Sequence, residues 1–201
     1  GELHRTIGVV RESMDRFENH PAAGAIITLV DALSNWYVRR SRDRFWGEGA
    51  SQDKWDAYNT LYEVLVDLAK LIAPFTPFFA ERLYRNLVAE PAEAAGMTGD
   101  GGVPASVHLC DYPIADAARM DHGLAAAMMV VRDVVSAGHS ARADAGLKVR
   151  QPLALAEVVV ADATADAAVA RHADLIADEL NVQRVEATAQ AEHYVTFSIK
   201  P

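Results

Sequence analysis

Apolar residues recur at spacings of three and four along most of the first 145 residues, which predicts a succession of amphipathic helices. The second run begins near Pro21, which suits the first turn of a helix, and continues to Trp46, where Gly47 offers a stop. The chain begins almost inside the first run, so we expect it to be a piece of a longer protein. The apolar face of the first run consists of Leu3, Ile7, Val10, Met14 and Phe17.

The second helix can be divided into two faces by placing successive residues 100° apart. One face is apolar, and its continuation meets Arg40 and Arg44. The opposite face, which we expect to be wet, carries Arg39, Arg42 and Trp46 together with an asparagine. The apolar face consists of Ile26, Leu29, Val30, Leu33, Trp36 and Tyr37.

A guanidinium in line with a buried stripe must reach water or pair with a carboxylate, because an unpaired buried charge is costly. We therefore assign structural roles to Arg40 and Arg44, and also to Trp36 and Tyr37 of the apolar face. Carboxylates on a facing helix can supply the partner. The expected partners are Glu63 and Asp67.

Two further helices are predicted before residue 90. Ser51 or Asp53 can cap the third helix, and Pro74 ends it. Thr76 and Pro77 open the fourth in the usual order of cap and proline. Short connections favour antiparallel neighbours, so an antiparallel helical bundle is expected. The predicted buried side chains are Trp55, Tyr58, Tyr62, Leu65, Val66, Ala69 and Ile72 in the third helix and Phe78, Leu83, Tyr84 and Leu87 in the fourth.

A loop rich in alanine, glycine and proline is expected over residues 91–118, followed by a fifth helix that Asp121 can cap. We assign residues 1–145 to one helical domain. Residues 146–201 change character and suggest a small, incomplete α+β unit. The chain as a whole is therefore expected to be mainly α. In the second unit, strands are expected at 153–161, 182–187 and 194–199, and a helix at 165–180.

Composition restricts the function more than it identifies it. The net charge of −9 argues against a protein that binds nucleic acid over its whole surface. A single cysteine excludes an internal disulfide framework and a multi-cysteine zinc site, and scattered histidines offer no metal-ligand spacing. The scarcity of cysteine favours a reducing cytoplasm, and no apolar run reaches membrane-spanning length, so we expect no membrane partner. Phosphate-cradling, nucleophile-elbow and dinucleotide motifs are also missing from the sequence, so we expect no catalytic residue and no metal or cofactor site.

One segment contrasts with this acidic background. Residues 39–44 hold four of the chain's 19 basic residues, and Trp36 and Trp46 flank them. Local positive charge with interleaved aromatic residues favours contact with nucleic acid, although most charge runs are simply solvated helix faces. For Trp46 the competing interpretation is a core anchor at the helix end.

Several stretches resemble the class Ia aminoacyl-tRNA synthetases. Residues 34–46, Ser-Asn-Trp-Tyr-Val-Arg-Arg-Ser-Arg-Asp-Arg-Phe-Trp, look like the signature helix of the anticodon-binding domain of the isoleucyl-tRNA synthetases. Residues 71–78, Leu-Ile-Ala-Pro-Phe-Thr-Pro-Phe, resemble an element that several class Ia enzymes share. Residues 106–109, 146–153 and 179–182 match in the same order, so the resemblance covers nearly the whole chain. The arginines of the first motif and the shortage of cysteines resemble the eukaryote-like branch.

The resemblance implies a non-catalytic helical module that recognises the anticodon stem-loop of isoleucine tRNA. ATP and magnesium would serve the full-length ligase, whose catalytic and editing domains lie upstream in the same chain, and a monomer is expected. Arginines can position phosphates while aromatic rings receive unstacked bases, so we expect Arg39, Arg42 and Trp46 to contact tRNA. Lys148 and Arg150 alternate at a strand entry and could reach the RNA backbone; an exposed strand edge is the alternative.

Three other interpretations remain open at this stage. The chain could be the corresponding module of the valine or leucine enzyme, although the motifs at 35–40 and 147–153 are closer to the isoleucine enzyme. It could be a helical protein–protein interaction domain with its arginines paired internally, which would show no salt-dependent binding to RNA. A free-standing enzyme ranks third because no catalytic constellation supports it.

Overall fold

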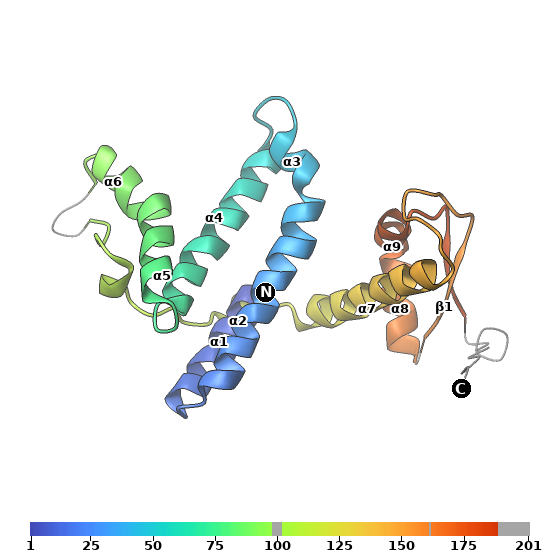
Figure 1. The fold of residues 1–201 in the computed structure, drawn as a ribbon, viewed down its shortest axis with the longest axis horizontal. Helices are drawn as coiled ribbons and strands as arrows, with labels where there is room; N and C mark the ends of the chain where they lie inside the picture. The colour runs from blue at the N-terminus through green and yellow to red at the C-terminus, as the bar shows by residue number, and fades with distance from the viewer. Residues whose placement is uncertain (98–101, 161, 189–201) are drawn as a thin grey trace. The chain divides into compact units, whose positions relative to one another are not determined.

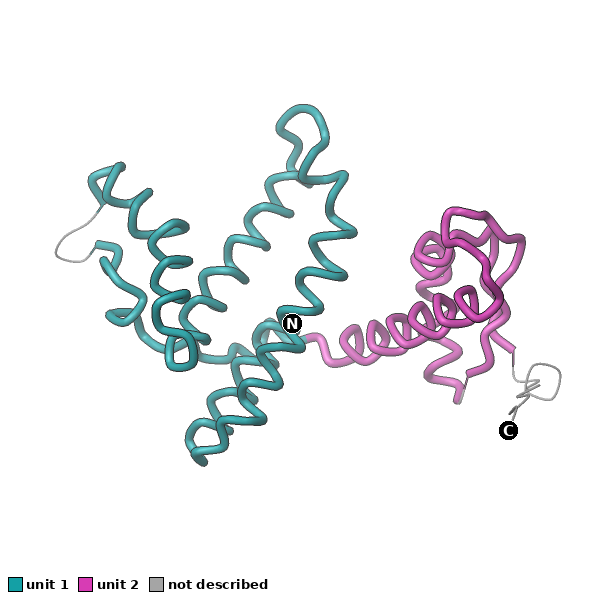
Figure 2. Tube along the Cα trace, viewed as in Figure 1, with its two compact units in different colours: residues 1–120 teal, residues 121–201 magenta. Residues whose placement is uncertain are grey.

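The computed structural model describes residues 1–97, 102–160 and 162–188, and these form two compact units, Gly1–Met120 and Asp121–Pro201 (Figure 2). The division falls before the fifth helix, whereas the sequence placed it after residue 145. The long helix after the boundary belongs with the second unit because it contacts the two helices that follow it, and Val131 and Val135 are buried there.

The first unit is built from helices, as expected, and from α1 to α6 they follow one another through short turns (Figure 1). α1 and α2 lie against each other, and α4 packs against α5. Two helices contain π-helical turns, η1 and η2, and two short 3₁₀ turns, η3 and η4, lie between residues 107 and 119. The bounds are α1 Glu2–Asp15, α2 Asn19–Ala32, η1 Leu33–Val38, α3 Arg42–Trp46, α4 Gln52–Ile72, α5 Pro77–Tyr84, η2 Arg85–Ala89, α6 Glu90–Ala94, η3 Val107–Leu109 and η4 Ala117–Arg119.

Two apolar clusters hold this unit together. The first joins α1, α2 and the second half of α4, and Ile7, Val10 and Leu71 in it have no exposed surface. The second joins α4, α5 and η3 around Tyr84, whose hydroxyl donates to the carbonyl of Pro104 at 3.0 Å. Burial of each such aliphatic side chain contributes about 1.5–3 kcal/mol, so these contacts dominate the stability of the unit.

Helix starts follow the expected chemistry. The hydroxyl of Ser51 accepts from the backbone N–H of Lys54 at 3.2 Å and caps α4. Asp121 caps the fifth helix through Leu124 N–H at 2.8 Å. Thr76 precedes Pro77 at the start of α5 but makes no capping bond with its side chain. Short polar side chains accept the orphan N–H groups of a first turn, which is why these boundaries can be found from the sequence.

Several residues that we expected to be buried are exposed. Trp55, Tyr58 and Tyr62 in α4 expose 55%, 43% and 47% of their surface, and Phe78 at the start of α5 exposes 91%. Of the residues predicted to be buried in α4, Ala69 alone is fully buried, and Leu65, Val66 and Ile72 are partly buried. In α4 the buried residues are Ala57, Leu68, Ala69 and Leu71.

Two residues predicted to be buried in the first two helices are also exposed. Phe17 lies beyond the end of α1 with a positive φ of 61° and is 91% exposed, and Val30 of α2 is 41% exposed. The loop expected from residue 91 begins later, because the helix after α5 continues through η2 and α6 to Ala94.

The segment that follows η3 is tied back to the bundle by polar contacts. The hydroxyl of Tyr112 donates to the carbonyl of Leu71 at 3.0 Å. Arg119 forms a bidentate ion pair with Glu63 of α4. Burial raises the pKa of Tyr112, while the hydrogen bond from Arg119 lowers the pKa of Glu63.

Within residues 121–160 and 162–188, the second unit contains one long helix, two shorter helices and a two-stranded parallel sheet. A parallel pair needs a crossover, and here the two shorter helices supply it. The expected single helix at 165–180 is divided at His172. The strand expected at 194–199 lies outside the described residues. The bounds are α7 His122–Asp144, β1 Ala156–Val159, α8 Ala163–Arg171, α9 Ala173–Leu180 and β2 Val185–Thr188, with Ala156 opposite Val185.

Gly138 marks a close approach between α7 and α9. A Cβ atom at this position would lie 2.6 Å and 2.7 Å from the two Cδ atoms of Leu180, whose side chain is buried. We expect Gly138→Ala to lower the free energy of unfolding of this unit by about 1–3 kcal/mol, because a packed core resists an added methyl group. Denaturant unfolding, monitored by circular dichroism, measures this change in the free energy of unfolding.

Gly123→Ala provides the control on the same helix, since its Cβ would meet only an oxygen of Asp121 at 3.5 Å. It should leave stability unchanged or raise it slightly, because alanine favours helix more than glycine does. Equal effects of the two substitutions would contradict the close approach.

The lowered pKa of Glu63 makes the stability of the first unit depend on pH. The contribution of its ion pair is fully present above the pKa of an unfolded glutamate, about 4.3, and is lost as the pH falls through the lower folded value. We expect Glu63→Gln to destabilise the unit at pH 7 but much less at pH 3, in thermal unfolding. Arg119→Gln should show the same pH dependence because it removes the same pair. A destabilisation of equal size at both pH values would be inconsistent with this assignment.

Candidate functional site at the α3 tip

The basic segment forms the end of the hairpin made by α2, η1, α3 and the start of α4, which we call the tip (residues 39–54). It is not one regular helix, because the π turn η1 follows α2 and the chain leaves helical geometry at Ser41 before α3. π turns are rare and are found frequently at functional sites. In Figure 1 the tip lies at the end of the hairpin remote from α1.

The two faces of the tip carry the side chains that the sequence predicted for them. Arg39 and Arg42 are exposed, whereas Arg40 and Arg44 are partly buried. Trp46 exposes 81% of its surface, so it is not a core anchor. Arg42 and Trp46 are four residues apart in α3 and therefore share one side of it.

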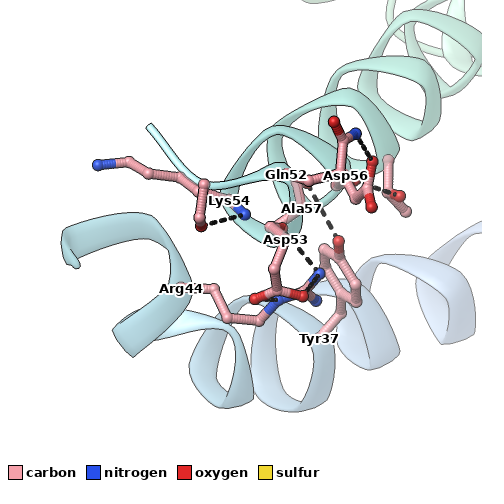
Figure 3. A network of polar contacts seen from close by, with 9 residues as sticks. Tyr37, Arg44, Gln52, Asp53, Lys54, Asp56 and Ala57 are labelled. Carbon is pink, nitrogen blue, oxygen red and sulfur yellow. Dashed lines mark hydrogen bonds and ion pairs between the residues drawn. The ribbon is translucent and has the colours of Figure 1, made fainter. Parts of the chain in front are cut away.

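Arg44 pairs with Asp53 at the start of α4, not with Glu63 or Asp67 as expected (Figure 3). Its Nε and Nη2 atoms each lie 2.8 Å from a carboxylate oxygen, and Nη2 also donates to the backbone carbonyl of Asp53 at 3.0 Å. The hydrogen bond with Asp53 raises the pKa of Arg44. The other two carboxylates are taken by Arg119 and Lys70.

Three aromatic side chains, those of Tyr37, Phe45 and Tyr58, pack together next to this ion pair. The ring of Phe45 lies 6.4 Å from that of Tyr37 and 5.1 Å from that of Tyr58, both in tilted or edge geometry. Tyr37 donates its hydroxyl to the carbonyl of Ala57 at 3.1 Å, as Figure 3 shows, and Tyr58 donates to the carbonyl of Phe45 at 3.2 Å. Edge-to-face pairs of this kind contribute about 0.5–1.5 kcal/mol each.

Trp36 lies under two guanidinium groups. The central carbon of Arg39 is 5.9 Å from its ring centroid and that of Arg40 is 5.7 Å away. Nε of Arg39 also donates to the carbonyl of Asn35 one turn earlier, at 2.9 Å. These contacts hold both guanidinium groups close to the Trp36 ring.

Lys148 and Arg150 belong to the second unit, so they form a separate group. A buried arginine, Arg142, organises the backbone around them: its Nη1 donates to the carbonyl of Lys148 and its Nη2 to that of Asn181, both at 3.1 Å. Asn181 in turn donates to the carbonyl of Val149 at 2.9 Å. The side chains of Lys148 and Arg150 are exposed.

The sequence analysis missed Asp53 and Phe45 as parts of this site. Asp53 was considered only as a helix cap, although it follows Arg44 by nine residues across a glycine-rich turn. A turn of this kind brings the residues on its two sides together. The spacing of nine residues across the turn could therefore have indicated that Arg44 pairs with Asp53. Phe45 was assigned to neither face because its position depends on the break at Ser41.

In the ranges 1–97, 102–160 and 162–188, no group of three or more histidine, cysteine or acidic side chains is arranged to hold a metal ion. None of the helices described there is long and apolar enough to cross a membrane.

Known proteins resemble this chain over most of its length. Residues 1–160 match the family described as the anticodon-binding domain of tRNA ligase. The isoleucine–tRNA ligase of Chlamydia trachomatis serovar D is 40% identical over 199 residues, which cover 99% of this chain and 18% of that protein. That of Dehalococcoides mccartyi strain 195 is 44% identical over 182 residues, 90% of this chain and 17% of the relative. The chain thus spans less than a fifth of the curated relatives it matches.

The positions of Arg39 and Arg40 lead to different expected effects on stability. Both guanidinium groups lie near the Trp36 ring, but only Arg40 is partly buried, so Arg40→Ala should lower the free energy of unfolding by about 1 kcal/mol because it loses packing as well as the cation–π contact. Arg39→Ala removes a similar contact from an exposed side chain and should cost about half as much. Thermal unfolding of the two variants measures the difference, and a reversed order would exchange the roles assigned to these residues.

Proposed function

This chain belongs to the family of anticodon-binding domains of tRNA ligases, and on that premise we propose that it recognises the anticodon stem-loop of isoleucine tRNA. The relatives support the choice of amino acid, since they are isoleucine–tRNA ligases at 40% and 44% identity. The motifs at 35–40 and 147–153 support it as well. The valine and leucine enzymes are not favoured by these relatives.

In this proposal the chain is the tRNA-recognition part of a larger ligase that attaches isoleucine to its tRNA. ATP and magnesium serve the catalytic domain, which lies upstream in the same polypeptide, and the residues of this chain carry no covalent chemistry. The full-length enzyme works as a cytoplasmic monomer. Its assignment to the eukaryote-like branch rests on Arg39, Arg42 and the scarcity of cysteine.

The observation that carries the proposal is the exposure of Trp46 on the same side of α3 as Arg42. Bases of an anticodon loop are unstacked and can be received on an aromatic ring, while guanidinium groups bind the adjoining phosphates. Trp46 supplies the ring, and Arg39 and Arg42 supply the charge.

Lys148 and Arg150 form a second contact with the RNA backbone in this proposal. They carry no sequence information themselves, because phosphate contacts position a protein without reading bases. Arg142 donates to the carbonyl of Lys148 and Asn181 to that of Val149, so the backbone of this segment is held where the two exposed side chains leave it.

Loss of both exposed tip arginines should weaken binding through lost phosphate contacts. We expect Arg39→Ala/Arg42→Ala to lower the affinity for an isoleucine tRNA transcript and to flatten the logarithmic salt slope by roughly one unit for each lost contact. Fluorescence anisotropy at 50–200 mM salt measures both. The double variant Arg5→Ala/Arg16→Ala removes the same charge from exposed residues of α1 and the turn after it, and should keep the wild-type slope.

The same titration tests the stacking role of Trp46. Trp46→Ala should weaken binding by about 1–3 kcal/mol without changing the salt slope, and Trp46→Phe should restore most of the loss, because stacking depends on the ring and not on charge. A valine tRNA transcript tests the amino-acid assignment. Binding that is absent, or independent of salt, would favour the protein–protein interaction domain instead.

A further inference from the structure

The RNA-facing side of the tip lies just beyond a break in the helix. Ser41 has φ and ψ of −86° and 7°, those of a turn, although it still donates to the carbonyl of Tyr37 at 2.9 Å and accepts from Phe45 N–H at 3.0 Å. The five residues of α3 are therefore held less firmly by their own backbone than the middle of a long helix is. The direction in which Arg42 and Trp46 are presented depends in addition on contacts with α4.

Those contacts converge on two neighbouring residues of α3. Arg44 binds Asp53 through both carboxylate oxygens and the backbone carbonyl, and Phe45 lies between two tyrosines, one of which donates to its carbonyl. Lys54 adds a bond from Nζ to the carbonyl of Gly47 at 2.7 Å. Two consecutive residues of α4, Asp53 and Lys54, thus bind α3 and the glycine that follows it.

We infer that Arg44 and Asp53 are a positioning pair, which fixes α3 against α4 so that Arg42 and Trp46 face the RNA together. The inference rests on the proposed function and adds two residues to it that touch no nucleotide. A planar guanidinium that makes three bonds to one residue fixes both distance and angle, which a lysine ammonium does not. Asp53 also compensates the positive charge of Arg44, so in this proposal the phosphates are bound by Arg39 and Arg42.

Asp53→Asn separates positioning from simple charge, because the two effects have opposite signs. Removal of a negative charge beside an RNA-binding surface should raise the affinity if electrostatics alone matters. If the carboxylate positions α3, the affinity should fall instead. The pair is partly exposed, with 68% of the Asp53 side chain accessible, so we expect a fall of about three- to fivefold.

Asp56→Asn is the matched control. Asp56 lies one turn further along α4, and its carboxylate accepts a hydrogen bond from Gln52 of the same helix at 2.7 Å. The substitution makes the same change of charge in the same part of the surface. It should leave the affinity unchanged or raise it slightly. Equal responses of the two variants would overturn the positioning role.

Arg44→Lys tests the other partner without any change of charge. A lysine would replace the arginine adequately if Arg44 were itself a phosphate contact, and the affinity would stay near the wild-type value. As a positioning residue it should lose about the same factor as Asp53→Asn, with an unaltered salt slope, because no phosphate contact is removed. Retained affinity in Arg44→Lys would overturn the inference.

A measurement without RNA keeps the inference separate from the proposed function. The backbone N–H groups of Phe45 and Gly47 donate within the tip, to Ser41 and Asp43 at 3.0 Å and 2.8 Å. Hydrogen exchange at these two amides should be faster in Asp53→Asn than in Asp56→Asn, because α3 opens more often when the pair is lost. Equal exchange rates in the two variants would overturn the positioning role of Arg44 and Asp53, even if the protein binds tRNA. Faster exchange in Asp53→Asn, in a protein that binds no tRNA, would support the positioning role and refute the proposed function.

Discussion

Burial of α1 and α2 against the end of α4 is the contact on which the first unit depends. Ile7, Val10 and Leu71 are fully enclosed there, and each contributes a large share of the apolar stabilisation. Nearer the tip, Val30 of α2 and Tyr62 of α4 are 41% and 47% exposed, so the apolar faces of these two helices are not buried along their whole length. The hairpin is closed by apolar packing at its base and by ion pairs, hydrogen bonds and aromatic rings at its tip. The two ends therefore respond to different conditions, since screening by salt acts mainly on the tip.

The distribution of charge follows the same division. A net charge of −9 keeps the bulk of the surface acidic, and the positive groups at residues 39–44 stand out against it. Pairing divides these groups further, because Arg44 is committed to Asp53 while Arg42 is exposed. A domain with this pattern attracts a polyanion over a short range and at one place, which restricts orientation more than it raises affinity.

Much of the fold could be predicted from the sequence, because helix caps and apolar periodicity are local. Ser51 and Asp121 cap their helices as expected, and the faces of the basic segment were predicted correctly for Arg39, Arg40, Arg42 and Arg44. Burial of aromatic residues in α4 was predicted wrongly, since periodicity locates a stripe but does not say whether a neighbour covers all of it. The partner of Arg44 was missed for a related reason: the sequence does not give the direction in which a chain leaves a glycine-rich turn.

The π turn η1 has a consequence for the length of this segment. The enclosed positions from Leu33 onward recur at intervals of four, at Tyr37, Ser41 and Phe45, whereas a regular α-helix would carry each of them about 40° further around the axis. The wider turn takes up that excess and keeps these positions on one side. It also contains one residue more than an α turn requires. Loss of a single residue here would convert the turn to α geometry without turning the tip away, so this stretch can tolerate a deletion that a regular helix could not.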